Sequence, residues 1–179
     1  LFYLLPPDQV CEILSTLGFE ISDPLDLLKK NYDYYVQRTS HGSTLSHVVH
    51  SAILKYLPDQ KENMYEKFIT ALKSDLCDSQ GGTTREGIHT GVMGGTVNMV
   101  ISSFAGISRY NEYLEIAPVI PGKWELVHFN IFHKGILFNI KINALFPKYY
   151  SGIGNNHFFI FSFILILVFI KQNAFFIKN

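Results

Sequence analysis

The segment Arg38-Thr-Ser-His-Gly-Ser-Thr-Leu-Ser46 stands just before a run of apolar residues with helical spacing. A second segment, Gln80-Gly-Gly-Thr-Thr-Arg-Glu-Gly-Ile-His89, combines the same hydroxyl residues, glycines and histidine, and it also precedes a helical pattern. The first backbone N–H groups of a helix lack partners and lie at the positive end of its dipole. Hydroxyl and imidazole groups beside two such helix starts predict a cradle for an oxyanion or a phosphate.

Five helices are predicted around these segments, because apolar residues recur with the spacing of one helix face. The predicted helices occupy residues 7–17, 24–35, 45–57, 63–76 and 88–104. Ser22 or Asp23 is expected to cap the second helix, with Pro24 at its first position. The residues expected on the inward faces include Leu25, Leu72, Leu76 and Val97.

The fifth predicted helix contains three glycines, Gly91, Gly94 and Gly95. Each glycine inside a helix costs about 1 kcal/mol of stability relative to Ala. Glycines in such a place predict close approach by a neighbouring element or a ligand.

After Gly106 the apolar pattern changes from helical spacing to alternation, which is typical of strands. Residues 124–132 and 136–142 form two predicted strands, and His133-Lys134-Gly135 forms the turn between them. Pro118 and Pro121-Gly122 mark the boundary between the helical and the β part. We therefore expect a mainly α domain over residues 1–110 and the start of a β module over residues 111–143.

The tail, residues 144–179, does not continue this pattern. Residues 157–170 are apolar on all sides but are shorter than the roughly 20 residues that a membrane-spanning helix needs. We interpret the tail as a frameshift or read-through product. A genuine hydrophobic membrane anchor is the alternative.

The composition narrows the classes of partner and compartment. The formal net charge is zero, which gives no electrostatic basis for nucleic-acid binding. Cys11 and Cys77 lie far apart without CxxC spacing, so we expect free buried thiols in a reducing, cytoplasmic compartment. His47 and His50 have a spacing that permits metal binding, but no carboxylate or cysteine completes a ligand set, so no metal is expected.

Several ordered motifs resemble family 65 of the glycoside hydrolases, which contains inverting disaccharide phosphorylases and related hydrolases. The resemblance covers about residues 1–143, and the 80–84 segment is similar to that of bacterial trehalose, maltose and kojibiose phosphorylases. The motifs that carry it are Tyr34-Tyr35, Arg38–Ser46, Ser74-Asp75, Asp78–His89, Met93-Gly-Gly-Thr96, Phe104-Ala-Gly106 and Leu114–Pro118, with Pro121 and Trp124.

This resemblance implies the last helices of an (α/α)6 barrel, followed by the first strands of a C-terminal β-sandwich-like module. It implies phosphorolysis of an α-glucosidic disaccharide to β-glucose 1-phosphate and glucose, with inorganic phosphate as co-substrate and without another cofactor. The general acid, a glutamate, and a Lys-Gln pair are expected upstream of Leu1, where we expect the chain to be cut from a longer, homodimeric protein. The fragment alone would be inactive.

The resemblance also implies roles for residues of the two opening segments. Ser43 and Thr44 match the family's paired hydroxyl residues, although a second serine is more usual than Thr44, and His89 matches its phosphate-binding histidine. His41 and Arg38 are secondary candidates for the same anion. The alternative for Ser43 and Thr44 is to cap the third helix, and for His89 a structural hydrogen bond.

Three carboxylates nearby have other expected roles. Glu86 is a candidate base in a hydrolase but is expected to pair with Arg85 or to cap the fifth helix. Asp75 and Asp78 are expected in turns and caps. Two alternatives to a phosphorylase remain open: a disaccharide hydrolase of the same family, and an inactive remnant with a membrane-associated tail.

Overall fold

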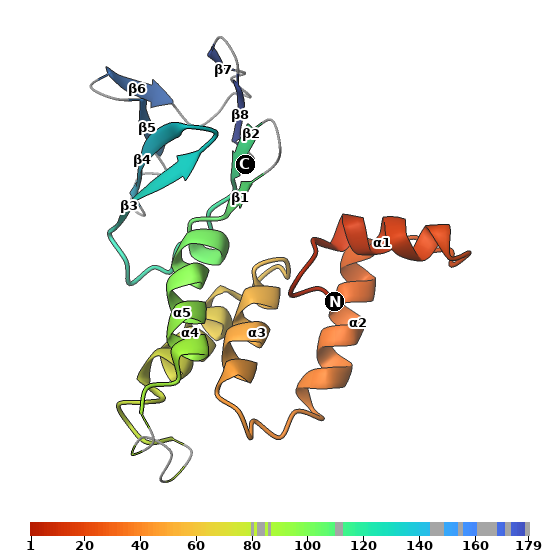
Figure 1. The fold of residues 1–179 in the computed structure, drawn as a ribbon. Coiled ribbons are helices and arrows are strands. Elements are labelled where there is room, and N and C mark those ends of the chain that lie inside the picture. Colours follow the sequence, from red (N-terminus) through yellow and green to blue (C-terminus); the bar gives the residue numbers. More distant parts are fainter. Residues whose placement is uncertain are drawn as a thin grey trace. The chain divides into compact units, whose positions relative to one another are not determined.

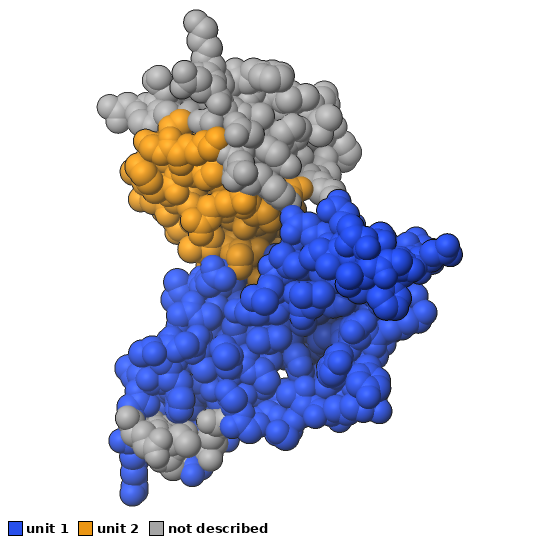
Figure 2. All heavy atoms as spheres, turned by 45° about the vertical axis from the view of Figure 1, so that its right-hand side comes forward, with its two compact units in different colours: residues 1–99 blue, residues 100–179 orange. Residues whose placement is uncertain are grey.

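The computed structural model describes residues 1–79, 81, 85, 87–109, 113–143, 149–153, 156–160, 168–170 and 173–177. The chain divides into two compact units, Leu1–Met99 and Val100–Asn179 (Figure 2). The first is helical and the second is built mainly from strands. The domain boundary after residue 110 that the sequence predicts stays a prediction.

All five predicted helices are present in the first unit (Figure 1). Helices α3, α4 and α5 contact one another, and α3 and α5 both start at the same end of this group (Figure 1). Helix α1 lies across the beginning of α2. The helices span α1 Pro7–Thr16, α2 Pro24–Val36, α3 Leu45–Leu54, α4 Lys61–Lys73 and α5 Thr90–Met99.

The start of α2 follows the expected rule for an N-cap. The Asp23 carboxylate accepts hydrogen bonds from the backbone N–H of Leu25 at 2.8 Å and of Asp26 at 3.2 Å. Two of the otherwise unpaired N–H groups are satisfied in this way. The prediction that Ser22 or Asp23 caps this helix is confirmed for Asp23.

The ends of α4 and α5 differ from the prediction. Helix α4 ends at Lys73, so Leu76 and Cys77 lie in the following turn and are exposed. The expectation of two buried thiols is therefore wrong for Cys77, while Cys11 is buried. Helix α5 ends at Met99, and a π-helix, η2 (Val100–Phe104), replaces its predicted last turns. The sequence spacing does not reveal this change, because the apolar pattern continues through it.

The helical unit has one buried cluster around Phe2, Val10 and Leu28, and helices α3, α4 and α5 bury a further set of apolar residues. Gly95 of α5 faces Val48 of α3 so closely that a Cβ atom at Gly95 would lie 2.8 Å from Val48 Cγ1. The predicted close approach is confirmed at Gly95, whereas Gly91 and Gly94 would have nothing within 4 Å of a Cβ. The buried apolar residues of these helices are Val48, Leu54, Met64, Phe68, Ala71, Val92 and Met99.

Several residues expected to face inward are exposed in this chain. Leu25, Leu72, Leu76 and Val97 are between 39% and 85% exposed. The expectation was wrong for these positions: Leu76 lies beyond the end of α4, and Leu25, Leu72 and Val97 lie on helix faces that the described elements of this chain leave exposed.

The second unit contains the predicted hairpin, made of β3 (Leu126–His133) and β4 (Ile136–Asn143). Its register pairs Leu126 with Asn143 and His133 with Ile136. The two turn residues, Lys134 and Gly135, have φ of +49° and +79°. Positive φ at both positions is the feature of the type I′ turn that suits a twisted hairpin. The residues of the hairpin that are buried alternate along both strands: Val127, Ile131, Phe138, Ile140 and Ile142.

The remaining strands were not expected from the sequence pattern. One sheet has the order β1-β2-β8-β7 and the other β3-β4-β5-β6. Strand β8 is parallel to β2, and the other pairings are antiparallel. The strands outside the hairpin are β1 (Ile107–Arg109), β2 (Tyr113–Ile116), β5 (Tyr149–Ile153), β6 (Asn156–Ile160), β7 (Val168–Ile170) and β8 (Asn173–Ile177).

The junction that leads into β1 depends on Gly106. Its φ is +65°, and a Cβ atom there would lie 1.9 Å from the backbone oxygen of Ala117. The Gly106 carbonyl accepts the Ala117 N–H at 3.0 Å.

Within the described part of the chain, no helix combines the length and the hydropathy of a membrane span.

Candidate functional site

The start of α3 places Ser43 and Thr44 in different environments. Ser43 is exposed, and its Oγ accepts a hydrogen bond from the Leu45 N–H at 3.3 Å. Thr44 is only 5% exposed, and its side chain makes no capping hydrogen bond. The capping alternative therefore applies weakly to Ser43 and not to Thr44, and capping leaves the Ser43 hydroxyl accessible.

His41 supports this helix start from within the same loop. The Ser46 hydroxyl donates its only hydrogen to the Ser43 carbonyl at 2.8 Å, so its oxygen accepts from His41 Nδ1–H at 2.7 Å. His41 has φ of +51°, an uncommon conformation for a residue other than glycine. These contacts assign the hydrogen of the neutral His41 ring to Nδ1.

Three histidines of this region lie together. The ring of His41 stacks on His47, with centroids 4.4 Å apart, and meets His50 edge-on at 5.5 Å. Thr39 donates its hydroxyl hydrogen to the Tyr35 carbonyl and therefore accepts from His50 Nε2–H, at 3.4 Å. Sequence spacing indicated only the proximity of His47 and His50, because His41 joins them from the preceding loop.

Within this histidine cluster (His41, His47 and His50), the surroundings of His47 and His50 favour the neutral form of those two rings. Burial, reinforced by the charge of Lys67 and by the neighbouring imidazoles, lowers the pKa of His50 to about 4. Burial also lowers the pKa of His47. Nδ1 of both rings is buried without a hydrogen-bond partner.

Arg38 is exposed and lies just after the end of α2. Its Nη1 donates to the Tyr34 carbonyl at 2.8 Å, and its guanidinium lies 3.8 Å from the centre of the Tyr34 ring. Part of its donor capacity is thus engaged by α2. Its contact with an anion, like that of His41, stays a prediction.

His89 lies just before α5 and is anchored to Asp75, which follows α4. Asp75 Oδ2 accepts the His89 backbone N–H at 2.8 Å, and Oδ1 contacts Nδ1 of the ring at 2.5 Å. These hydrogen bonds lower the pKa of the Asp75 carboxyl. The sequence pattern predicts Asp75 in a turn or cap and does not reveal its contact with the ring, because the partner is 14 residues away.

Ser43, Thr44 and His89 are thus located at the starts of two helices that begin at the same end of the helical group (Figure 1). The two helices approach each other closely where Gly95 of α5 contacts Val48 of α3. Val48 lies four residues after Thr44, and Gly95 lies six residues after His89. Gln80, Gly82, Thr83, Thr84 and Glu86 lie outside the described residues, so the expected role of Glu86 lies outside them as well.

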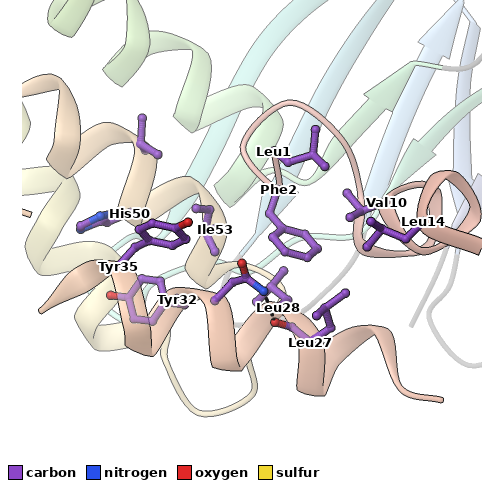
Figure 3. Close-up of a pocket in the computed structure, with 12 residues that line it drawn as sticks. Leu1, Phe2, Val10, Leu14, Leu27, Leu28, Tyr32, Tyr35, His50 and Ile53 are labelled. Carbon is purple, nitrogen blue, oxygen red and sulfur yellow. Dashed lines mark hydrogen bonds between the residues drawn. The ribbon is translucent and has the colours of Figure 1, made fainter. Parts of the chain in front are cut away.

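A separate cavity of about 450 Å³ lies among the N-terminal segment, α1, α2 and α3. Figure 3 shows the ring of Phe2 between Val10 on one side and Ile53 on the other. The lining of the cavity is mainly apolar. The side-chain amide of Asn31, one of the lining residues, donates to the Leu27 carbonyl at 2.9 Å. The cavity does not include Ser43, Thr44 or His89.

Among the described residues, no group of three or more His, Cys, Asp or Glu side chains has an arrangement that could hold a metal ion.

The family model and the relatives that match this chain indicate the same family. Residues 11–98 match the model of the glycosyl hydrolase family 65 central catalytic domain. The trehalose 6-phosphate phosphorylase of Lactococcus lactis is 41% identical over 142 residues, which are 79% of this chain and 18% of that protein. The kojibiose phosphorylase of Caldanaerobacter subterraneus is 39% identical over 113 residues, 63% of this chain and 14% of that protein.

The fold has a counterpart among solved structures. A structure named "Putative kojibiose phosphorylase from human microbiome" superposes with a TM-score of 0.64 at 23% identity, over 93% of this chain and 22% of that chain. The chain therefore belongs to glycosyl hydrolase family 65, and the matched segment is part of its central catalytic domain. It spans less than a fifth of the length of the Lactococcus lactis protein.

Proposed function

We propose that this chain is part of an enzyme that carries out phosphorolysis of an α-glucosidic disaccharide, giving β-glucose 1-phosphate and a second sugar. The observation that supports this most directly is that two helix starts lie at the same end of the helical group (Figure 1). One presents the exposed Ser43 hydroxyl and the other presents His89, in a family whose matched relatives are named disaccharide phosphorylases.

In this proposal Ser43, Thr44 and His89 bind the phosphate, and His41 and Arg38 contribute secondary contacts. Phosphate attacks the anomeric carbon while an acid protonates the leaving oxygen on the opposite face of the sugar. The nucleophile is itself an anion, so the protein must hold it rather than deprotonate a water. The acid, a glutamate, is proposed to come from outside this chain.

We also propose that the helices form the last part of an (α/α)6 barrel and that the strands begin a C-terminal β-sandwich-like module. Exposed apolar residues on several helices, such as Ile13, Leu25, Leu72 and Val97, suit faces that further helices would cover. The longer protein is proposed to be a cytoplasmic homodimer.

The proposal is tested with inorganic phosphate and a full-length enzyme that carries these residues. Ser43→Ala or His89→Ala should raise the KM for phosphate by about 10-fold or more, because a hydrogen bond to a charged group contributes roughly 1.5–3 kcal/mol. The KM for the disaccharide should change little. Ser40→Ala, an exposed serine of the same loop, is the matched control. Trehalose, kojibiose, maltose and trehalose 6-phosphate are the substrates to compare.

Turnover without phosphate separates this proposal from the hydrolase alternative. A phosphorylase should lose its activity when phosphate is removed, whereas a hydrolase should keep it. Unchanged turnover in phosphate-free buffer would therefore overturn the phosphorylase assignment. A normal KM for phosphate in one variant would return that residue to a structural role.

A further inference from the structure

Asp75 holds His89 by two separate hydrogen bonds, and Asp75 itself is not one of the candidate phosphate ligands. One carboxylate oxygen accepts the backbone N–H and the other contacts the ring. The Asp75 side chain is only 10% exposed, whereas that of His89 is 34% exposed. The pair joins the segment after α4 to the residue before α5, so it fixes the backbone and the side chain of His89 together.

The contact assigns the proton on the ring. An ionised carboxylate only accepts hydrogen bonds, so the hydrogen between Oδ1 and Nδ1 belongs to His89. The lowered pKa of Asp75 agrees with an ionised carboxylate at neutral pH. A half-turn of the ring would replace Nδ1–H by a carbon and lose this bond. The orientation and the tautomer of His89 are therefore set by one residue.

The consequence concerns the other ring nitrogen, Nε2, which lies on the far side of the imidazole from Asp75. With Nδ1 as the donor to Asp75, Nε2 of the neutral ring accepts a hydrogen bond, which suits the P–OH group of a phosphate. After uptake of a second proton it donates to a phosphate oxygen instead. Either form requires Nε2, rather than Nδ1, to face the ligand.

We propose that Asp75 is a positioning residue, which holds His89 in the Nδ1–H tautomer and presents Nε2 to phosphate. The inference rests on the proposed function of His89. Partners of this kind behind ligand-binding histidines fix the tautomer and ring orientation in metal sites, where their loss typically costs about 10–100-fold in affinity or activity. We expect the lower end of that range for an anion.

The first experiment measures the tautomer directly in the 179-residue chain, by long-range ¹H–¹⁵N correlation NMR of the histidine rings. His89 should show a protonated Nδ1 and an unprotonated Nε2 when the ring is neutral. In Asp75→Asn the amide can also donate, so the Nε2–H form should gain population. Asp33→Asn, an exposed carboxylate that pairs with Lys29 on α2, should leave the His89 signals unchanged.

The second experiment measures binding of inorganic phosphate to the same variants by calorimetry. Asp75→Asn should weaken binding about 10-fold, and Asp75→Glu, which retains the carboxylate, should recover part of the loss. Circular dichroism confirms that each variant keeps its helices. Weaker binding in Asp75→Asn without a change of tautomer would overturn the positioning role.

The two proposals fail in different ways. If His89→Ala binds phosphate as well as the unchanged chain, the phosphate role of His89 is wrong, and the tautomer measurement still decides whether Asp75 sets the ring. If the unchanged chain shows His89 with Nε2–H, Asp75 does not set the tautomer, even where His89→Ala abolishes phosphate binding.

Discussion

The starts of α3 and α5 carry similar residue types but are held in opposite ways. At α3, the stabilising contacts are local: His41 donates to Ser46, and Ser46 donates to Ser43, within six residues. At α5, the anchor is distant, because Asp75 reaches His89 across the connection from α4. The first start can form as soon as its own loop folds, whereas the second requires α4 and α5 to be in place.

This difference shows at which helix start phosphate binding and stability depend on different residues. At α3 the exposed Ser43 hydroxyl is the candidate ligand group, and the histidines behind it serve the loop. At α5 a single residue, His89, both anchors the helix start and is the candidate ligand group. Changes to the residues behind Ser43, such as Ser46 and His50, should therefore alter stability first, whereas changes to the Asp75–His89 pair should alter phosphate binding and the anchor of α5 together.

Acid should affect the α3 start most strongly. The pKa of His50 is lowered to about 4 from its ordinary 6.5, so the unfolded chain binds a proton there before the folded chain does. Stability is full above pH 6.5 and falls as the pH drops towards 4, by at most about 3 kcal/mol for this group. Urea unfolding followed by helical circular dichroism between pH 7.5 and 4 measures the loss.

The neighbours of His50 make this prediction specific. His47 shares its helix, His41 approaches from the loop, Tyr32 from α2, and the charge of Lys67 comes from α4. His50→Gln should flatten the pH dependence, whatever its effect on stability at neutral pH. His128→Gln, an exposed histidine of β3, should leave the dependence intact. An equally steep dependence in His50→Gln would contradict the assignment.

The contact between the two helices should be sensitive to a single methyl group. Gly95→Ala places a Cβ 2.8 Å from Cγ1 of Val48, which is fully buried and stiff at its side-chain torsion. Overpacking of this kind costs about 1–3 kcal/mol, which at its lower end equals the roughly 1 kcal/mol that Ala gains in helix propensity and otherwise exceeds it. We expect a net loss of up to about 2 kcal/mol in the free energy of unfolding.

Gly94→Ala is the matched control for this change. It lies on the same helix, is exposed, and a Cβ there meets nothing within 4 Å. Its expected effect is a gain of up to about 1 kcal/mol, so the two neighbouring substitutions should have opposite signs in urea unfolding. A gain for Gly95→Ala as well would show that α3 and α5 do not approach as closely as described.

The parts of the fold that the sequence predicts are those with local signals. The Asp23 cap and the Lys134-Gly135 turn are each specified by adjacent residues. The π-helix after Met99 and the strands β1 and β2 were missed. The π-helix continues an apolar helical pattern, and the two strands have only three and four residues.

In the candidate site, too, the features that the sequence predicts are those with local signals, and the long-range contacts are missed. Glycines, hydroxyls and a histidine before a helical pattern identify Ser43, Thr44 and His89 as candidates, because each lies next to a helix start in the sequence. The sequence cannot pair Asp75 with His89, since this contact depends on how α4 and α5 pack. It also cannot bring His41 onto His47, because a positive φ at His41 turns the loop back over α3.

The smallest expected effect concerns Ser46, the middle member of the local contacts at α3. Ser46→Ala removes the hydrogen bond to the Ser43 carbonyl and the one from His41, in a partly exposed loop where water can replace them. A net loss of about 0.5–1 kcal/mol is expected, since Ala also favours the first turn of the helix. Ser40→Ala, in the same loop, should be near neutral. Equal stabilities of the two variants in urea unfolding would mean that the α3 start does not depend on its own hydrogen bonds, and the contrast with the Asp75 anchor at α5 would then be lost.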